Sequence, residues 1–175
     1  MEGFYNPATN RLNMKDTVRV YLRNINSPYS IVDSAKGVVD SVQLAVQVLF
    51  PNLASGTYYI QVKHRNSIET WSKSGGEVYQ PYITLQYDFK TSAANAFGSN
   101  QVQVDSSPLR FALYSGDANQ DGTIDATDLS LIDNDATNFL TGYLQTDITG
   151  DGFTDGTDYS IADNNAYNFV SVVRP

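Results

Sequence analysis

The chain has 175 residues, a formal net charge of −8 and no cysteine. This length allows one or two small domains. The missing cysteine excludes disulfides, thiolate metal sites and a cysteine nucleophile. No apolar run approaches the roughly 18–20 residues that a membrane-spanning helix needs, so no membrane insertion is expected.

The charge is divided unevenly along the chain. Residues 1–116 hold ten Lys/Arg and eight Asp/Glu, a net charge of +2, whereas residues 117–175 hold eleven Asp and one basic residue, a net charge of −10. This asymmetry predicts two domains, residues 1–115 and 116–175. Because nucleic-acid binding needs basic groups against the phosphates, no nucleic-acid partner is expected for the acidic part.

The first two thirds of the sequence predict short β-strands, because apolar and polar residues alternate there with a period of two. Turn residues such as Ser27-Pro28, Ser55-Gly56 and Gly75-Gly76 separate the alternating segments. This pattern favours an antiparallel β-sandwich of seven or eight strands, and therefore a mainly β chain with a small α module behind it. The alternating segments are residues 18–22, 42–50, 58–62, 83–89, 101–104 and 109–114.

No catalytic residue is predicted in this N-terminal part. His64 is the only histidine, so a Ser-His-Asp arrangement would have to use it, and no nucleophile motif lies nearby. Glu69 and Glu77 could form a carboxylate pair for glycoside hydrolysis, but the sequence gives no sign of a cleft around them.

The aromatic side chains leave sugar binding as an open alternative. Trp71, Tyr58, Tyr59, Tyr79 and Tyr82 could stack on a flat ligand. We favour the simpler interpretation that alternating tyrosines pack a small sandwich and keep their hydroxyls in water. A glycan array with a Trp71→Ala control separates the two.

Two segments of the C-terminal part repeat each other thirty residues apart. Aligned without a gap, residues 117–140 and 147–170 share 12 of 24 positions. The shared aspartates and glycine include relative positions 1, 5, 6, 9 and 12, the ligand spacing of a twelve-residue calcium loop with glycine at its sharp turn. We therefore predict two bound calcium ions, one in each loop.

Each loop offers the oxygen ligands that calcium prefers. The candidate ligands are Asp117, Asn119, Asp121, Thr123 (carbonyl), Asp125 and Asp128 in the first loop, and Asp147, Thr149, Asp151, Phe153 (carbonyl), Asp155 and Asp158 in the second. Because Thr149 offers a hydroxyl where Asn119 offers an amide oxygen, the second site is predicted to be the weaker one. Magnesium fits these loops less well, because it prefers six-fold geometry and keeps its waters.

A helical pattern follows each loop, with apolar residues at spacings of three and four. Asp128 and Asp158 fall in the first turns, where the helix dipole favours negative charge. The two helices are expected to face each other, with Phe139 and Phe169 in a shared small core.

This arrangement resembles a dockerin, the two-repeat, calcium-folded module of secreted bacterial proteins, over about residues 115–172. The resemblance rests on the pattern D-x-N-x-D-G-x-x-D-x-x-D and on its repetition, and it implies calcium-dependent folding and binding to a cohesin module on another protein. Asp133-Asn134 and Asp163-Asn164 stand where dockerins often carry a basic pair, which makes the helix faces acidic. In the N-terminal part, residues 55–64 resemble a strand of transthyretin-like or carboxypeptidase-regulatory-like sandwiches; an Ig-like sandwich fits the same strand pattern.

The sequence therefore predicts a non-enzymatic, extracellular, calcium-stabilised assembly module of a bacterial cell surface. The sandwich would be a spacer or interaction surface, and the paired repeats would bind a cohesin-like partner. One alternative is a self-associating subunit of a fibre or adhesin, in which residues 1–6 complete a neighbour's sheet. Another is a carbohydrate-binding module that uses Trp71 and tyrosines. No flexible linker joins the two parts, so they are expected to pack rigidly.

Overall fold

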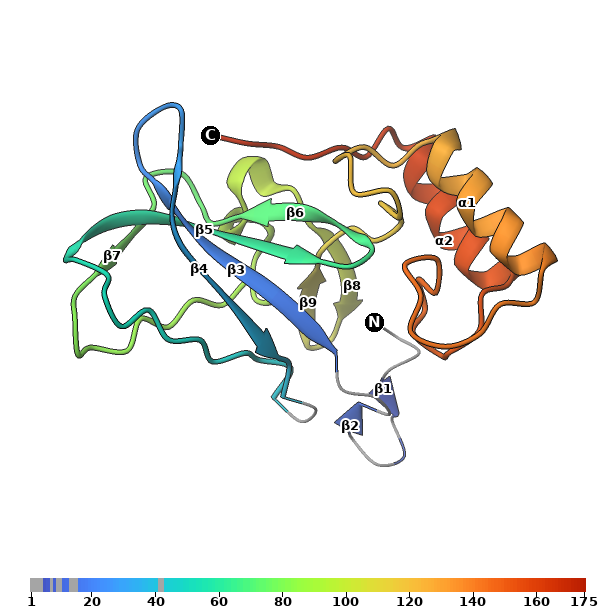
Figure 1. Cartoon of the computed structure of the whole chain (residues 1–175), viewed down its shortest axis with the longest axis horizontal. Helices are drawn as coiled ribbons and strands as arrows, with labels where there is room; N and C mark the ends of the chain where they lie inside the picture. Colours follow the sequence, from blue (N-terminus) through green and yellow to red (C-terminus); the bar gives the residue numbers. More distant parts are fainter. Residues whose placement is uncertain (1–4, 7, 9–10, 13–15, 41–42) are drawn as a thin grey trace.

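The computed structural model describes residues 5–6, 8, 11–12, 16–40 and 43–175. As predicted, the chain is mainly β with a small helical part, which lies in the C-terminal third (Figure 1). The central element is a five-stranded antiparallel sheet in the order β4-β3-β5-β6, in which β7 also pairs with β5. Its strands are β3 (Thr17–Asn24), β4 (Ile31–Val38), β5 (Gly56–His64), β6 (Ser67–Trp71) and β7 (Glu77–Tyr79).

Short hairpins and two helices complete the described chain. The hairpins are β1 (Tyr5–Asn6) with β2 (Arg11–Leu12), and β8 (Val102–Ser106) with β9 (Leu109–Ala112). The helices are α1 (Ala126–Thr137) and α2 (Gly156–Tyr167), and two single 3-10 turns, η1 (Ala93–Asn95) and η2 (Phe97–Ser99), precede β8. Neither α-helix is long and apolar enough to cross a membrane. Of the segment expected to complete a neighbour's sheet, residues 1–4 lie outside the described residues and β1 pairs within its own chain.

The main core lies on one face of the sheet. Alternate residues of β3 turn Val18, Val20 and Leu22 into it, and Ile60 of β5 joins them. Burying such a side chain contributes about 1.5–3 kcal/mol, so the alternation in β3 decides which face of the sheet is covered. The cover consists of half-buried side chains from two extended segments, residues 46–50 and 85–89.

These two covering segments are not strands, so the strand predictions for residues 42–50 and 83–89 are wrong for the part that the structure describes (residue 42 lies outside it). Their alternate side chains do face the core, but no backbone ladder joins residues 43–50 or 83–89 to a neighbouring strand. A period of two shows which side of a segment is buried, and it does not show whether a hydrogen-bonding partner lies beside it.

The sequence pattern does not predict β4 or β6. Because β4 is an edge strand with many exposed side chains, it has little apolar alternation to detect. Every position of β6 is buried, so polar residues such as Glu69 and Thr70 lie inside. One glycine of β4 is needed for close packing: a Cβ on Gly37 would lie 2.3 Å from Cγ2 of Val46.

The C-terminal part packs directly against the sheet through β6. Ile68, which is 0% exposed, lies in a small cluster with Ile124 and Val170. The Ile68 N–H also donates to the carbonyl oxygen of Tyr114 (3.0 Å), just before the first repeat begins. Apolar packing and backbone pairing therefore hold the two parts together without a linker.

The chain after α2 returns to the sheet (Figure 1). Asn100 Nδ2 donates to the carbonyl oxygen of Ser171 (2.9 Å), and Arg174 Nε lies 2.5 Å from Glu69 Oε1. Both ends of the C-terminal part are therefore fixed to the N-terminal part, which fits the predicted rigid packing.

Candidate metal centre

The first loop winds around the side chain of Asp117, which is 2% exposed. Asp117 Oδ2 accepts the N–H of Gly122 (3.2 Å), and Asp128 Oδ1 accepts the N–H of Asn119 (3.0 Å). Gly122 has a φ of 93°, a conformation in which glycine is least strained. The first and last predicted ligands of the loop are therefore both held against its backbone turn.

Between the first and last ligands of the first loop, the side chains of Asn119 and Asp121 accept hydrogen bonds from backbone N–H groups two residues further on. The Asp121 N–H donates to Asn119 Oδ1 (2.8 Å), and the Thr123 N–H donates to Asp121 Oδ1 (2.9 Å). Asn119 Nδ2 also donates to Asp121 Oδ2 (2.8 Å). Each carboxylate oxygen has more than one lone pair, so these bonds leave acceptor capacity for a cation.

The second loop repeats this geometry with a buried Asp147. Asp147 Oδ1 accepts the N–H of Gly150 (2.7 Å), and its Oδ2 accepts the N–H of Gly152 (3.2 Å). Asp158 Oδ1 accepts the Thr149 N–H (2.7 Å). The hydroxyl of Thr149 lies 3.4 Å from Asp147 Oδ1, whereas the amide of Asn119 in the first loop contacts Asp121.

The last two aspartates of each loop also start a helix. Asp125 is the N-cap of α1 and accepts the Thr127 N–H (2.7 Å), while Asp128 Oδ2 accepts the Asp125 N–H (3.0 Å). Asp155 and Asp158 form the same capping box at α2. Because such a cap stabilises a helix by about 0.5–2 kcal/mol, loop geometry and helix position are coupled.

The two repeats also close each other. The chain after α2 pairs with the first loop, and the chain after α1 pairs with the second loop at the same relative positions. The backbone pairs are Ile124–Val170 and Gly122–Val172 in one case and Thr154–Leu140 and Gly152–Gly142 in the other, with N···O distances of 2.8–3.1 Å. Each loop therefore receives two backbone hydrogen-bonding partners from the other repeat.

The crowded carboxylates have raised pKa values. Burial, together with the charges of Asp128 and Asp121, raises the pKa of Asp117 to about 6. Burial also raises the pKa of Asp128 and of Asp147. A divalent cation bound among these groups would favour their ionised forms, because an opposite charge lowers the pKa of a carboxyl group.

One buried oxygen atom of the first loop indicates room for a bound cation. Asp117 Oδ1 is buried and has no hydrogen-bond partner, although buried polar atoms are nearly always paired. A bound calcium ion would supply the missing interaction. In the described residues, however, no three carboxylate or histidine side chains already converge into a metal cage. The full ligand set, including the carbonyls of Thr123 and Phe153, therefore stays a prediction.

The predicted shared core of Phe139 and Phe169 is wrong. Their side chains are 87% and 89% exposed, and the helix pair instead buries Ile132, Ile148 and Ala162. Each helix ends two residues before its phenylalanine, which has a φ of 54° or 53°. The apolar periodicity of the helices therefore does not apply to these two positions. Each phenylalanine lies just beyond its helix and has the left-handed conformation that often ends a helix.

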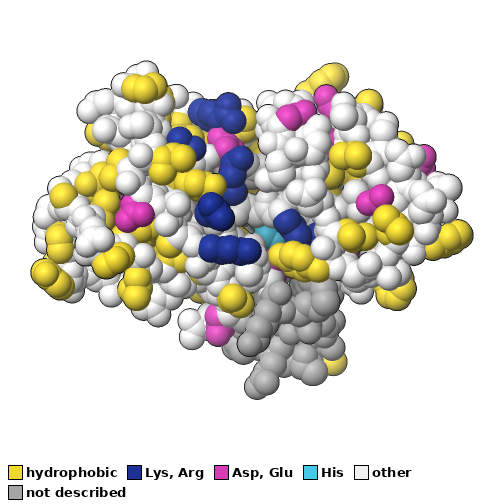
Figure 2. All heavy atoms as spheres, viewed as in Figure 1, with side chains coloured by type: hydrophobic (Ala, Val, Ile, Leu, Met, Phe, Trp, Pro, Cys, Tyr) yellow, Lys and Arg dark blue, Asp and Glu magenta, His cyan; other side chains and the backbone are white. Residues whose placement is uncertain are grey.

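The turn between β5 and β6 lies against both loops. Asn66 Nδ2 donates to the carbonyl oxygen of Asp147 (2.8 Å), and Arg65 Nη2 lies 3.7 Å from Asp147 Oδ2. On the other side, Gln120 Nε2 of the first loop donates to the carbonyl oxygen of Ser67 (3.2 Å). Figure 2 shows the Lys and Arg side chains gathered over the sheet next to the C-terminal part. Arg65 thus already faces the first ligand of the second loop.

A buried polar network fixes the segment that precedes the second loop. The Tyr143 hydroxyl donates to Asp16 Oδ1 (2.5 Å), and His64 Nε2 lies 2.7 Å from Asp16 Oδ2. Burial alone would raise the pKa of Asp16. The hydrogen bond and ion pair with His64, together with the bonds from Tyr143 and the Thr17 N–H, outweigh it and lower the pKa to about 2.

This network places a serine, a histidine and an aspartate in line. His64 Nδ1 lies 3.4 Å from Ser67 Oγ, while its other nitrogen contacts Asp16. All three side chains are buried, with exposed fractions of 7% for Ser67 and His64 and 0% for Asp16. The serine hydroxyl is therefore not accessible to a substrate, and the network joins the two parts of the chain through Asp16 and Tyr143.

Glu69 and Glu77 do not have the properties of the two catalytic carboxyl groups of a glycosidase. Burial would raise the pKa of Glu69, but hydrogen bonds from Arg174 and Trp71 outweigh it and lower the pKa. Glu77 pairs with Lys73 (3.6 Å). A general acid for glycoside hydrolysis needs a raised pKa, so these contacts fit structural ion pairs.

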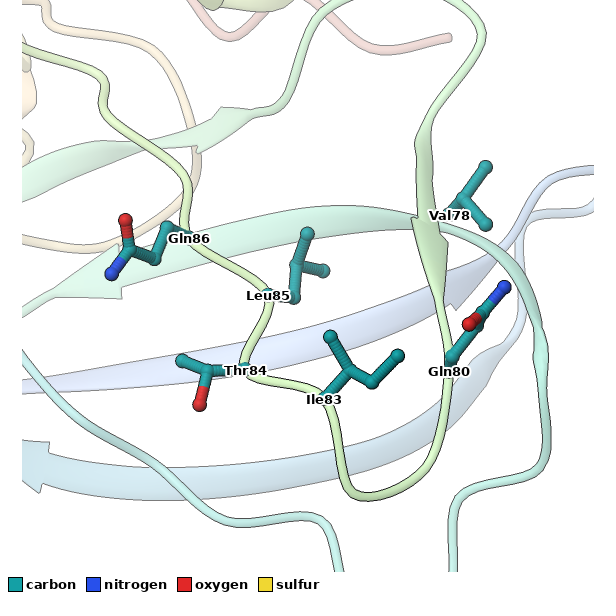
Figure 3. A pocket seen from close by; sticks show the side chains of 6 residues that line it. All are labelled: Val78, Gln80, Ile83, Thr84, Leu85 and Gln86. Carbon is teal, nitrogen blue, oxygen red and sulfur yellow. The ribbon is translucent and has the colours of Figure 1, made fainter.

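The aromatic rings considered for sugar stacking are mostly covered. Trp71 and Tyr59 are 4% and 6% exposed, and their rings meet edge to face at 6.0 Å. An open depression of about 310 Å³ lies near β7, away from the loops (Figures 1 and 3). It is lined by Val78, Gln80, Ile83, Thr84, Leu85 and Gln86. None of these side chains is charged, so the depression holds no carboxylate, histidine or lysine for catalysis or metal binding.

Residues 115–165 match the dockerin type I domain family. The match covers both loops, α1 and most of α2, and it leaves the N-terminal part unassigned. No curated protein and no solved structure matches the chain. The match supports a non-catalytic, calcium-binding, EF-hand-like module of the kind that docks to cohesin domains.

Proposed function

We propose that residues 116–175 form a calcium-dependent docking module that binds a cohesin-like domain of another protein outside the cell, and that the N-terminal part is its rigid spacer. The observation that supports this most strongly is the buried, unpartnered oxygen of Asp117 in a duplicated loop that matches dockerins. Each loop would hold one calcium ion through its aspartates, Asn119 or Thr149, and the carbonyl of Thr123 or Phe153.

Calcium would act on folding rather than on chemistry. Two bound ions reduce the net charge of residues 117–175 from −10 to about −6, which weakens the repulsion between the loops. A ligand that binds only the folded state stabilises it by about 2.7 kcal/mol when its concentration is 100 times Kd. Removal of calcium should therefore open the C-terminal part before the sheet.

We assign the exposed sides of α1 and α2 as the surface for a partner, because the β5–β6 turn lies against the loops. Phe139 and Phe169 lie at the ends of this surface. A bulky residue with a positive φ is strained relative to glycine, and these two side chains contribute almost nothing to their own core. We assign them as contacts to the partner. Because residues 117–173 contain no Lys or Arg, that partner should present basic residues around an apolar pocket.

Binding to immobilised cohesin domains in millimolar calcium and in EDTA tests the proposal. We expect calcium-dependent binding that is lost in the double variant Asp117→Ala/Asp147→Ala. If no cohesin is bound, or if binding persists in EDTA with the loops unfolded, the proposal is wrong.

The double variant Phe139→Gly/Phe169→Gly tests the contact surface separately. Glycine suits a positive φ, so this variant should melt at the same or a higher temperature, while partner binding falls at least about tenfold. Tyr82→Gly is the matched control, because Tyr82 is also fully exposed with a φ of 67° but lies in the N-terminal part. The control should leave binding unchanged.

A further inference from the structure

The outer face of the sheet carries three basic side chains in one row. Arg19 of β3 is the direct cross-strand neighbour of Lys36 on β4 and of Lys63 on β5. Since Val18 and Val20 face the core, Arg19 points to the opposite face. Neighbours of this kind have Cβ atoms about 4.5–5.5 Å apart, and like charges in such pairs are destabilising. The Arg19–Lys36 and Arg19–Lys63 pairs therefore carry a repulsion that a bound anion would reduce.

A fourth basic side chain extends the row along β3. Arg23 lies on the same face, two alternations from Arg19, with its guanidinium 5.2 Å from the Trp71 ring centre. Lys63 pairs with Glu69 (3.5 Å), whereas no ion pair among the described residues involves Arg19, Arg23 or Lys36. We call Lys36, Arg19, Lys63 and Arg23 the basic stripe. It forms part of the band of Lys and Arg side chains over the sheet in Figure 2.

Polar and aromatic groups lie between the cations of the stripe. Tyr21 stands between Arg19 and Arg23, whose guanidinium carbons lie 6.0 and 5.5 Å from its ring centre. Its cross-strand neighbour Ser34 is exposed. The stripe thus offers fixed positive charges at strand spacing, about 4.8 Å, together with hydroxyl groups that can bond to sugar hydroxyls.

We infer that the basic stripe binds a carboxylate-bearing polysaccharide. This inference goes beyond the proposed docking function, because the stripe lies on the N-terminal part and uses neither the loops nor the helices. It also differs from ring stacking on Trp71, which is buried. The attraction comes from a row of fixed cations that acts on carboxylates repeated along a chain.

The acidic C-terminal part next to the sheet limits how wide a ligand of the basic stripe can be. Residues 117–173 carry eleven Asp and no Lys or Arg, so a broad polyanion such as a nucleic-acid duplex or an acidic globular surface would meet this part and be repelled. A polysaccharide chain is narrow enough to contact the stripe alone. An acidic peptide is equally narrow, but it would lose side-chain entropy for each carboxylate that it fixes, whereas a uronate ring holds its carboxylate rigidly.

Calorimetric titration of the full chain in calcium tests this inference with three probes: a hyaluronan oligosaccharide, a neutral chitin oligosaccharide of equal length, and a poly-glutamate peptide of equal charge. We expect binding of the uronate oligosaccharide that weakens as salt is added, and binding of the other two that is at least about tenfold weaker. No binding of the uronate overturns the inference. Equal or tighter binding of poly-glutamate also overturns it, because the stripe would then serve an acidic protein segment.

Two double variants with the same change in net charge complete the test. Arg19→Gln/Lys36→Gln should lower the uronate affinity at least about tenfold while its melting temperature stays equal or rises, since a repulsion is removed. Lys73→Gln/Lys90→Gln, away from the stripe, should change the affinity by less than about twofold. Equal losses in both variants would mean that net charge alone attracts the ligand, and would contradict a defined site. Because cohesin binding is measured separately, either proposal can fail without the other.

Discussion

The two repeated loops share one backbone plan, yet their first aspartates have different surroundings. Asp117 Oδ1 in the first loop is buried without a partner, and the pKa of Asp117 is raised to about 6. Asp147 Oδ1 in the second loop accepts the Gly150 N–H (2.7 Å), and the Arg65 guanidinium lies 3.7 Å from its Oδ2. The first ligand of the second loop is partly satisfied by the protein itself, whereas the first loop has a buried acceptor that a bound cation would satisfy.

The fourth position of each loop explains part of this difference. Gly150 turns with a φ of 78° and donates its N–H to Asp147. Gln120 makes the same turn with a φ of 63°, and its side chain bonds to the carbonyl oxygens of Asp117 and Ser67. We therefore expect residues outside the loop, and not ligand spacing alone, to set the affinity of each site. Both Thr149 and Arg65 lead us to expect weaker binding in the second loop.

The largest expected effect comes from removing the last ligand of each loop. Asp128→Ala should lower the affinity of the tighter site roughly 100-fold, because a buried charged ligand and half of a capping box are lost together. Asp158→Ala should abolish the weaker step and leave the tighter one. Calorimetry measures both, with the exposed Asp133→Ala as control. If both variants lower the calcium affinity of the same binding step by the same factor, the prediction that the two loops differ is wrong.

The anchor of the second loop should be the next most sensitive. Because the pKa of Asp16 is lowered to about 2 from 3.8, its stabilising effect is present above about pH 4 and is lost as the pH falls through about 2. Asp16→Asn should therefore cost about 2 kcal/mol at neutral pH. Hydrogen exchange should show faster opening at Tyr143 and Asp147 than at Asp117. Asp105→Asn, an exposed control, should change neither quantity, and uniform opening of both loops would contradict the assignment.

The first loop should also respond to mild acid. The pKa of Asp117 is raised, so its neutral form favours the metal-free fold; that contribution is present below about pH 4 and is lost as the pH rises through about 6. Calcium needs the ionised form, so the first-site affinity should fall about tenfold between pH 7 and pH 5. Calorimetry at the two pH values measures this. An unchanged affinity would show that Asp117 is not a ligand.

The smallest expected effect is at Arg65. Replacing this cation by glutamine removes a positive charge from Asp147, so the second-site affinity should rise about fivefold while the first site changes by less than about twofold. Arg110→Gln is the control, since Arg110 lies on β9. A lower second-site affinity in Arg65→Gln would mean that the guanidinium positions the loop rather than competing with the ion.

Much of the C-terminal part could be predicted from its residues because its information is local. The spacing of Asp117, Asp121 and Asp128 sets both the turns and the helix start, and α1 and α2 lie where the pattern places them. The exposed phenylalanines could not be predicted from helical spacing, since the positive φ at Phe139 depends on where the helix ends. The carboxylate differences between the loops also come from Arg65, more than fifty residues away.

The N-terminal part could be predicted less completely because its structure depends on pairing between distant segments. Alternation located β3 and β5 and the core side of residues 43–50, but it could not show which segments have hydrogen-bonding neighbours. The contact of Asp16 with Tyr143 joins residues 127 positions apart, and no motif marks either one. One signal does lie in the sequence: Lys63 at the end of β5 and Arg65 in the turn after it are cations in a chain whose other part is strongly acidic.

A calorimetric titration of calcium into the metal-free chain tests the central claim most directly. The account predicts two ions per chain in two unequal steps, with the tighter step lost in Asp117→Asn and the weaker step lost in Asp147→Asn. Absence of calcium uptake, or loss of the tighter step only in Asp147→Asn, would contradict it.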